Sequence, residues 1–210
     1  MKLAIFGATG KTGRHLVEQA LAAGHSVTAL ARDPARLPQT HDRLTLVPGD
    51  VRDPAAVAQT IAGAEAVLSV LGPTGSQPDF AVSRGMDNIL AALRDHGVRR
   101  LIVSAGAGVR DPLDKPTLLH AFFGTLVKVL SKNVYLDMLQ VVDKVRASDT
   151  DWTIVRVPRL MDTPPTGQVF TGYVNKDLKT SLSRADLAAY MLQQLTDRSH
   201  LRQAPAISNL

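Results

Sequence analysis

The sequence predicts one α/β domain, a doubly wound parallel sheet with helices on both of its faces. Short apolar runs that end in glycine or proline alternate along the chain with longer segments of helical period. That alternation is typical of parallel sheets whose crossover connections are helices. The 210 residues suit a single domain, and a hydrophobic fraction of 45% is enough for its core. No internal repeat or flexible linker divides the chain, so we expect one domain over residues 1–210.

The strands are expected where a short apolar run stops at a turn residue. They are Lys2–Phe6, Ser26–Ala31, Leu44–Val47, Ala64–Leu71, Arg99–Val103 and Trp152–Val157, with a shorter one at Val169–Val174. Ligands of such sheets bind beyond the carboxyl ends of the strands, where the strand order reverses. The residues that follow each strand are therefore the first candidates for function.

The helices are expected between the strands, where apolar residues recur at helical spacing. They are Lys11–Ala23, Pro54–Ile61, Phe80–His96, Pro116–Ser131, Val134–Ser148 and a last helix that begins at Ser183. Gly24 stands where a C-cap glycine of the first helix belongs. Ser183 and Asp186, three residues apart, form a capping-box-like pair at the start of the last helix.

The charge balance favours an anionic small molecule as partner. The formal net charge is +5 and the sequence pI is near 9.7. Such a balance attracts nucleic acid, acidic lipid or phosphate-bearing ligands. The basic residues are scattered without a long Lys/Arg run, so we expect no nucleic-acid partner and favour an anionic cofactor or substrate.

Several kinds of site are not expected. The chain has no cysteine, which excludes disulfides and thiolate chemistry and suits the cytoplasm, the expected location. Its six histidines show no metal-ligand spacing, so no metal site is expected. The apolar stretch 117–130 is shorter than the roughly 20 residues that span a bilayer, so no membrane partner is expected. A lid, a pocket wall and a subunit interface remain open alternatives for that stretch.

A GxxGxxG run directly follows the first expected strand and opens the first expected helix. Glycines there permit a tight turn and let backbone amides and the helix N-terminus approach a pyrophosphate. The alternative is a glycine-rich turn that holds no ligand. The contacts expected from this run are Gly7, Thr9, Gly10, Lys11, Thr12 and Gly13. The spacing resembles that of the short-chain dehydrogenase/reductase superfamily, especially its extended and atypical branches, and predicts a Rossmann-type dinucleotide site.

Two arginines follow the second expected strand. Arg32 stands 32 − 13 = 19 residues after Gly13, where an acidic residue would bind the ribose 2′-hydroxyl of NAD. Arg36 lies one helical turn later, and two guanidinium groups can clamp a 2′-phosphate. A solvated surface pair is the alternative, and Asp33 could weaken the preference. We expect NADP(H) to be preferred, with NAD(H) possible.

Two further turns are expected to contact the cofactor. Asp50 and Val51 follow the third strand, where such a pair meets adenine: the carboxylate accepts the exocyclic amine and the valine covers the ring. A helix N-cap is the alternative role for Asp50, and both roles can hold. Leu71, Gly72 and Pro73 end the fourth strand, where small residues let backbone approach the ribose; a plain turn would look the same.

The expected catalytic residue is Ser104, which ends the fifth strand. Short-chain reductases place a Ser or Thr there to bond the reacting carbonyl or the carboxamide; a turn serine is the alternative. No Tyr-x-x-x-Lys occurs in the chain, which argues against ordinary alcohol–ketone chemistry. His120, in the apolar stretch, and Arg159, which follows Pro158, are candidate substrate contacts, although both could be structural or solvent-facing.

The chain resembles the atypical short-chain reductases of the NmrA-like type, which include flavin and biliverdin reductases. The resemblance covers most of the chain and rests on AIFGATGKTGRHLVEQALAAGHSVTALARDPARLP near its start, GDV at 49–51, SVLGP at 69–73, DWTIVRVPRLMDTPPTG at 151–167 and SRADLAAYML at 183–192. It implies the cofactor contacts given above, the active-site role of Ser104, and a nicotinamide wall at Pro158. Arg159 is a departure, because the flavin reductases have histidine there, and segment 110–150 is more apolar.

The resemblance implies an NADPH-dependent reductase of a conjugated acceptor such as a flavin, a quinone or a biliverdin-like molecule. The flavin and biliverdin reductases also lack Tyr-x-x-x-Lys. The alternative is a non-catalytic NAD(P)-binding redox sensor of NmrA type. Substrate-side elements are expected at about 110–135 and 158–182, in a monomer or a small homo-oligomer.

Overall fold

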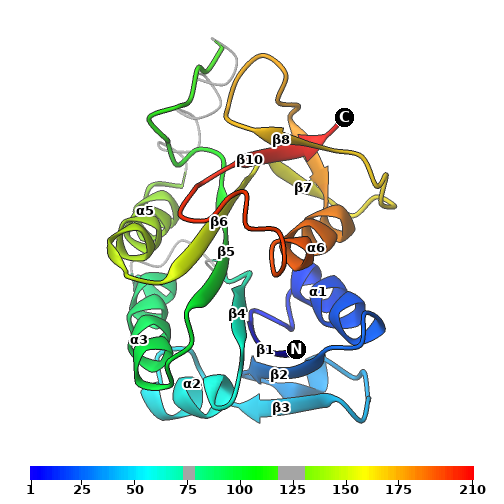
Figure 1. Cartoon of the computed structure of the whole chain (residues 1–210), viewed down its shortest axis with the longest axis vertical. Coiled ribbons are helices and arrows are strands. Elements are labelled where there is room, and N and C mark those ends of the chain that lie inside the picture. The colour runs from blue at the N-terminus through cyan, green and yellow to red at the C-terminus, as the bar shows by residue number, and fades with distance from the viewer. Residues whose placement is uncertain (73–78, 118–130) are drawn as a thin grey trace.

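In the computed structural model, which describes residues 1–72, 79–117 and 131–210, a central sheet lies between two layers of helices (Figure 1). Its strands, in sheet order, are β3 (Leu44–Pro48), β2 (Ser26–Ala31), β1 (Lys2–Phe6), β4 (Ala66–Ser69), β5 (Arg100–Gly106), β6 (Asp151–Val157), β10 (Ala206–Asn209) and β8 (Val169–Gly172). β8 pairs antiparallel with β10, and the other neighbouring strands pair in parallel.

The helices divide between the two faces of this sheet (Figure 1). One layer contains α1 (Lys11–Ala22) and α6 (Arg184–Gln193), and the other contains α2 (Pro54–Ile61), α3 (Ala81–Asp95) and α5 (Lys132–Ala147). Each layer buries its own apolar core against the sheet, the first around Leu16 and Met191 and the second around Met86 and Val145. The predicted doubly wound α/β fold is confirmed.

The order of the strands reverses at β1, and this reversal positions the site. Phe6, the last residue of β1, lies beside Leu30 of β2 on one side and beside Ser69 of β4 on the other. The chain leaves β1 toward β2 and β3, then returns to the opposite side through β4 and β5. The connections after β1 and β4 therefore diverge, which opens a crevice at the carboxyl ends of these strands.

The sequence predicts some elements to the residue and misses others. β1, β2 and α2 have the expected bounds. The small strands β7 (Arg159–Met161) and β9 (Ser181–Ser183), which pair with each other, and β10 are not predicted. They have three or four residues each, too few for a strand pattern to stand out from a loop.

The helix expected at Pro116–Ser131 lies almost entirely outside the described residues. The described residues at its ends, Pro116, Thr117 and Ser131, are not helical, and α5 begins at Lys132 rather than at Val134.

The expected capping box of the last helix is only half right. The Ser183 hydroxyl accepts the N–H of Asp186, which confirms the N-cap. The buried Asp186 carboxylate does not return the bond to Ser183. It accepts instead the N–H groups of Thr166 at 2.9 Å and Gly167 at 3.0 Å and the side-chain amide of Asn209 at 2.7 Å. Because its partners are remote in sequence, Asp186 joins a loop and β10 to α6.

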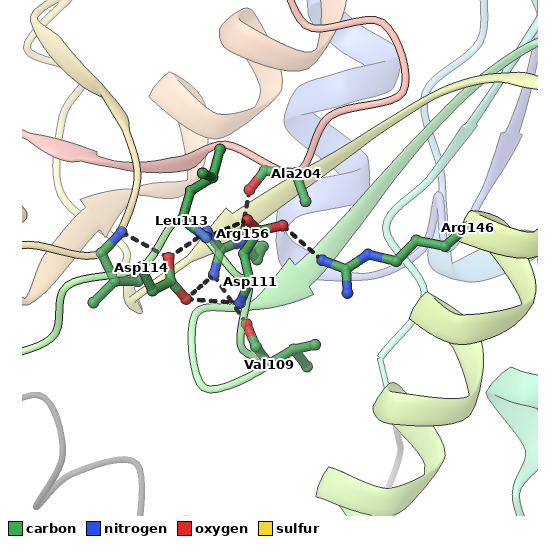
Figure 2. A network of polar contacts seen from close by, with 8 residues as sticks. Val109, Asp111, Leu113, Asp114, Arg146, Arg156 and Ala204 are labelled. Atoms are coloured by element: carbon green, nitrogen blue, oxygen red, sulfur yellow. Dashed lines mark hydrogen bonds and ion pairs between the residues drawn. The ribbon is translucent and has the colours of Figure 1, made fainter.

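A buried ion pair fastens the loop after β5 to β6 (Figure 2). The Arg156 side chain is fully buried, and it donates two hydrogen bonds to the Asp114 carboxylate, at 2.7 and 2.8 Å. Its other N–H groups donate to the carbonyl oxygens of Val109, at 3.0 Å, and Ala204, at 2.7 Å. Asp114 also accepts the N–H of Val174, at 3.0 Å. Removal of the carboxylate would leave this buried guanidinium without its counter-charge and without two of its hydrogen bonds.

Replacement of Asp114 by alanine should therefore cost about 3–5 kcal/mol of the free energy of unfolding, because it leaves the Arg156 charge buried without its partner. Urea unfolding measures the loss. Asp87→Ala is the control, since Asp87 pairs with Lys144 at the exposed surface, and it should cost less than about 1 kcal/mol. Equal losses in the two variants would contradict this role of the buried pair.

Acid should also remove the stabilisation that the Asp114–Arg156 pair provides. Burial raises the pKa of Asp114, but the hydrogen bonds from Arg156 and from the Asp111 and Val174 amides outweigh it and hold this pKa below its usual value. Stability from a lowered carboxyl pKa is present above the ordinary value and is lost as pH falls through the lowered one. The difference in unfolding free energy between wild type and Asp114→Ala should shrink between about pH 5 and about pH 2. A constant difference would show that Asp114 does not titrate in this range.

Candidate functional site

The glycine-rich turn after β1 brings the start of α1 close to the carboxyl ends of the central strands. Gly7 has a positive φ of 85°, and a Cβ there would lie 2.8 Å from the carbonyl oxygen of Val70. A Cβ on Gly13 would overlap the Gly7 carbonyl oxygen. Gly10 is the N-cap of α1, and its N–H donates to the Gly7 carbonyl at 3.0 Å. The first-turn amides of α1 therefore stand just beyond β1, in the arrangement that binds phosphate at helix N-termini.

A cavity of about 260 Å³ opens next to this turn, at the reversal of the strand order. Nine of the residues expected from the sequence lie in its wall: Gly7, Thr9, Gly10, Arg32, Arg36, Asp50, Val51, Leu71 and Gly72. They come from the ends of β1, β2, β3 and β4. The glycines leave room for backbone to approach a ligand, because a Cβ on Gly72 would meet no atom within 4 Å and one on Gly10 would meet only the Gly7 carbonyl oxygen. The cavity and its glycine cradle fit a dinucleotide.

Arg32 and Arg36 form the basic end of this cavity. Asp33, between them, accepts the N–H of Ala35 at 3.1 Å and so caps the short 3₁₀ turn η1 (Pro34–Arg36). Among the described residues Asp33 forms no ion pair with Arg32, so it does not neutralise that guanidinium directly. The Arg14 guanidinium donates to the Arg36 carbonyl at 2.9 Å and ties this turn to α1.

Asp50 is held by its neighbour Arg52. The Arg52 side chain donates from Nε to Oδ1 at 2.8 Å and from Nη2 to Oδ2 at 3.1 Å. These bonds are the main reason that the pKa of Asp50 lies below its usual value, so the carboxylate is ionised at neutral pH. The alternative role of Asp50 as an N-cap is wrong, because Asp53 caps α2 through the N–H of Ala55, at 2.9 Å.

The N-terminus of a second helix also faces the cavity, but a carboxylate already caps that N-terminus. The buried Asp137 of α5 accepts the N–H groups of Val82, at 3.2 Å, and Ser83, at 2.8 Å, in the first turn of α3. Asp137 and Val82 both line the cavity. A ligand phosphate would meet the Asp137 charge there, whereas no carboxylate caps α1. The arrangement therefore directs an anion toward α1.

Three residues of the glycine run, Lys11, Thr12 and Gly13, lie outside the cavity wall. The Lys11 ammonium pairs with Asp162 at 2.5 Å, and Asp162 also accepts a hydrogen bond from Arg184 at 2.7 Å. These two cations hold the pKa of Asp162 below its usual value. Lys11 thus connects the start of α1 with the segment after β7.

The residues expected on the substrate side are spread along the carboxyl edge of the sheet. Ser104 is half-buried in β5 beside Val155, and Pro158 follows β6 directly. Arg159 is exposed at the start of β7, and its N–H donates to the Thr180 carbonyl at 3.2 Å. These three residues do not line the cavity. Two other expected contacts, Pro73 and His120, lie outside the described residues.

The sequence prediction misses several residues of the wall, among them the charged Arg52, Asp79 and Asp137. Arg52 follows the expected adenine contacts directly, and this adjacency is a signal in the sequence. No local pattern marks Asp137, because it caps a helix that begins more than fifty residues earlier in the chain.

The described part of the chain holds no group of three or more His, Asp or Glu residues that could bind a metal. Within that same part, no helix has the length and apolar character needed to cross a membrane.

Comparisons with known proteins agree with this geometry. A family model described as NAD(P)H-binding matches residues 7–198. The chloroplastic protein At2g34460 of Arabidopsis thaliana is 29% identical over 202 residues, which cover 84% of this chain and 68% of that protein.

Solved structures show the same fold. A short-chain dehydrogenase/reductase of Veillonella parvula in complex with NADP has a TM-score of 0.83 at 21% identity, over 99% of this chain and 94% of that one. ChuY, an anaerobillin reductase of Escherichia coli O157:H7, has a TM-score of 0.78 at 19% identity, over 100% and 97%. The family match covers most of the chain, including the glycine turn and the ends of β2, β3 and β4 that line the cavity. The chain belongs to the NAD(P)H-binding family.

Proposed function

We propose that the protein is an NADPH-dependent oxidoreductase that reduces a flat conjugated acceptor such as a flavin, a quinone or a biliverdin-like molecule. The observation that carries the proposal is a cavity whose wall contains both the glycine turn before α1 and the two arginines Arg32 and Arg36. The names of two neighbours in fold, an NADP complex and an anaerobillin reductase, support the cofactor and the kind of acceptor.

In this proposal, protein residues of suitable chemistry bind each part of the cofactor. The backbone of Gly7, Thr9, Gly10, Thr12 and Gly13 and the N-terminus of α1 bind the pyrophosphate, with Lys11 beside them. Arg32 and Arg36 bind the 2′-phosphate, because guanidinium groups donate two parallel hydrogen bonds to phosphate oxygens. Asp50 and Val51 bind adenine, Leu71, Gly72 and Pro73 lie along the ribose, and Pro158 forms the nicotinamide wall.

The chemistry requires little of the protein beyond orientation. When bound, the reduced cofactor supplies a hydride to an acceptor that stacks on its nicotinamide ring. Ser104, which lies in β5 two residues before the end of the strand, donates a hydrogen bond to the acceptor carbonyl or to the carboxamide. Water supplies the proton that completes the two-electron reduction, which is consistent with a chain that has no Tyr-x-x-x-Lys. Arg159 and His120 contact the acceptor. We place this activity in the cytoplasm, in a monomer or small homo-oligomer.

Turnover tests the proposal directly. Purified protein is mixed with NADPH, and the reduced-nicotinamide absorbance is followed as FMN, a quinone or biliverdin is added in turn. We expect oxidation well above the spontaneous rate, with saturation in at least one acceptor. Tight cofactor binding without turnover on any of them would contradict the enzyme and favour the redox sensor.

The role of Arg32 predicts a selective loss. Arg32→Ala should weaken NADPH binding by about tenfold or more and NADH binding much less, because only NADPH carries the 2′-phosphate. Fluorescence titration with both cofactors measures this ratio. Arg94→Ala, which removes an exposed arginine at the far end of α3, is the charge-matched control. Equal losses for the two cofactors in Arg32→Ala would remove Arg32 from the phosphate site.

A further inference from the structure

We infer that Arg52 is a positioning residue that makes the cofactor site specific for adenine over 6-oxo purines, by orienting the Asp50 carboxylate so that one acceptor position on Oδ2 stays open to the base. The inference rests on the proposed function, in which the base of the cofactor meets Asp50 and Val51. Arg52 lines the same cavity as these two residues.

Most of the hydrogen-bond acceptor positions of the Asp50 carboxylate are already used within the protein. Oδ1 accepts two, from the backbone N–H of Arg52 at 2.9 Å and from its Nε at 2.8 Å, and Oδ2 accepts one, from Nη2 at 3.1 Å. An ionised carboxylate offers about four acceptor positions, two on each oxygen. The open position is therefore on Oδ2, and it can take one donor.

A single open acceptor distinguishes the two kinds of purine. Adenine carries an amine at position 6 and donates to it, whereas hypoxanthine and guanine carry a carbonyl there, which is itself an acceptor. Two acceptors that face each other repel and leave both groups without a donor. Asp50 cannot supply the missing donor, because a carboxylate ionised at neutral pH has no proton to give to a 6-oxo group.

The backbone that carries this pair is fixed. The side-chain amide of Asn88 donates to the Val51 carbonyl at 2.9 Å. Gly85 of α3 packs so closely on Val51 that a Cβ there would lie 2.5 Å from its Cγ1. Both contacts restrain the turn in the position that presents Asp50 to the cavity. The fork from Arg52 restrains the remaining freedom, the rotation of the Asp50 carboxylate about its own bond.

Other charges near the pair leave this geometry unchanged. Asp79 lies 3.9 Å from Nη1 of Arg52, a nitrogen that donates no bond to Asp50. The Arg52 side chain is half exposed, so its removal should affect folding little. The effect of the residue should appear in base selectivity rather than in stability.

The test compares NADPH with its reduced 6-oxo analogue, in which hypoxanthine replaces adenine. Dissociation constants of both are measured by fluorescence titration for the wild type, for Arg52→Met and for the control Arg94→Met. The two ligands carry the same phosphates, so the ratio of their constants cancels any general effect of losing a positive charge. We expect the wild type and the control to prefer NADPH by about tenfold or more, and Arg52→Met to reduce this ratio at least about fivefold.

A second variant tests the acceptor itself. Asp50→Asn introduces an amide that can donate to a 6-oxo group, so its preference for NADPH should be lost or reversed. Thermal melting confirms that each variant is folded. A wild type that binds both ligands equally, or Arg52→Met with an unchanged ratio, would overturn the inference and leave the proposed function standing. A wild type that does not bind NADPH would overturn both.

Discussion

The close approach of α1 to the end of β1 is the constraint on which the site depends. Gly7 must adopt a positive φ beside the Val70 carbonyl, and Gly13 must pack against the Gly7 carbonyl, so that the turn can be this tight. The same turn lies where the strand order reverses between β2 and β4, and that reversal opens the cavity. Glycines, helix and crevice therefore form one arrangement, which a side chain at either glycine would disrupt.

The charged groups around the cavity differ from one part of its wall to another. The N-terminus of α1 has no carboxylate cap, whereas Asp137 fills that of α3, so the phosphate-binding end is the one next to the glycine turn. Arg32 and Arg36 also line the cavity, and Asp33, which caps η1, forms no ion pair with them in the described chain. Arg52 holds the Asp50 carboxylate through two side-chain hydrogen bonds and keeps its pKa below its usual value. A bound dinucleotide thus meets a different chemistry along each part of its length.

The sequence is sufficient for features that depend on neighbours in the chain. The glycine turn, the main alternation of strands and helices, and most of the expected residues that follow β1 to β4 have a local pattern, and the structure places them as predicted. Contacts between remote segments are not predicted: Asp137 caps a helix more than fifty residues away, and Asp186 bonds Thr166 and Asn209 instead of closing a capping box. The short strand β10 is missed for the same reason, because its pairing with β8 defines it and its composition does not.

A crystal structure of the protein with bound NADPH would test this arrangement, because it locates each part of the cofactor at once. We expect the pyrophosphate against the first-turn amides of α1, beside Gly10, and the 2′-phosphate between Arg32 and Arg36. A pyrophosphate bound at the N-terminus of α3, with Asp137 displaced, or a cofactor lying in the reverse direction along the cavity, would contradict it.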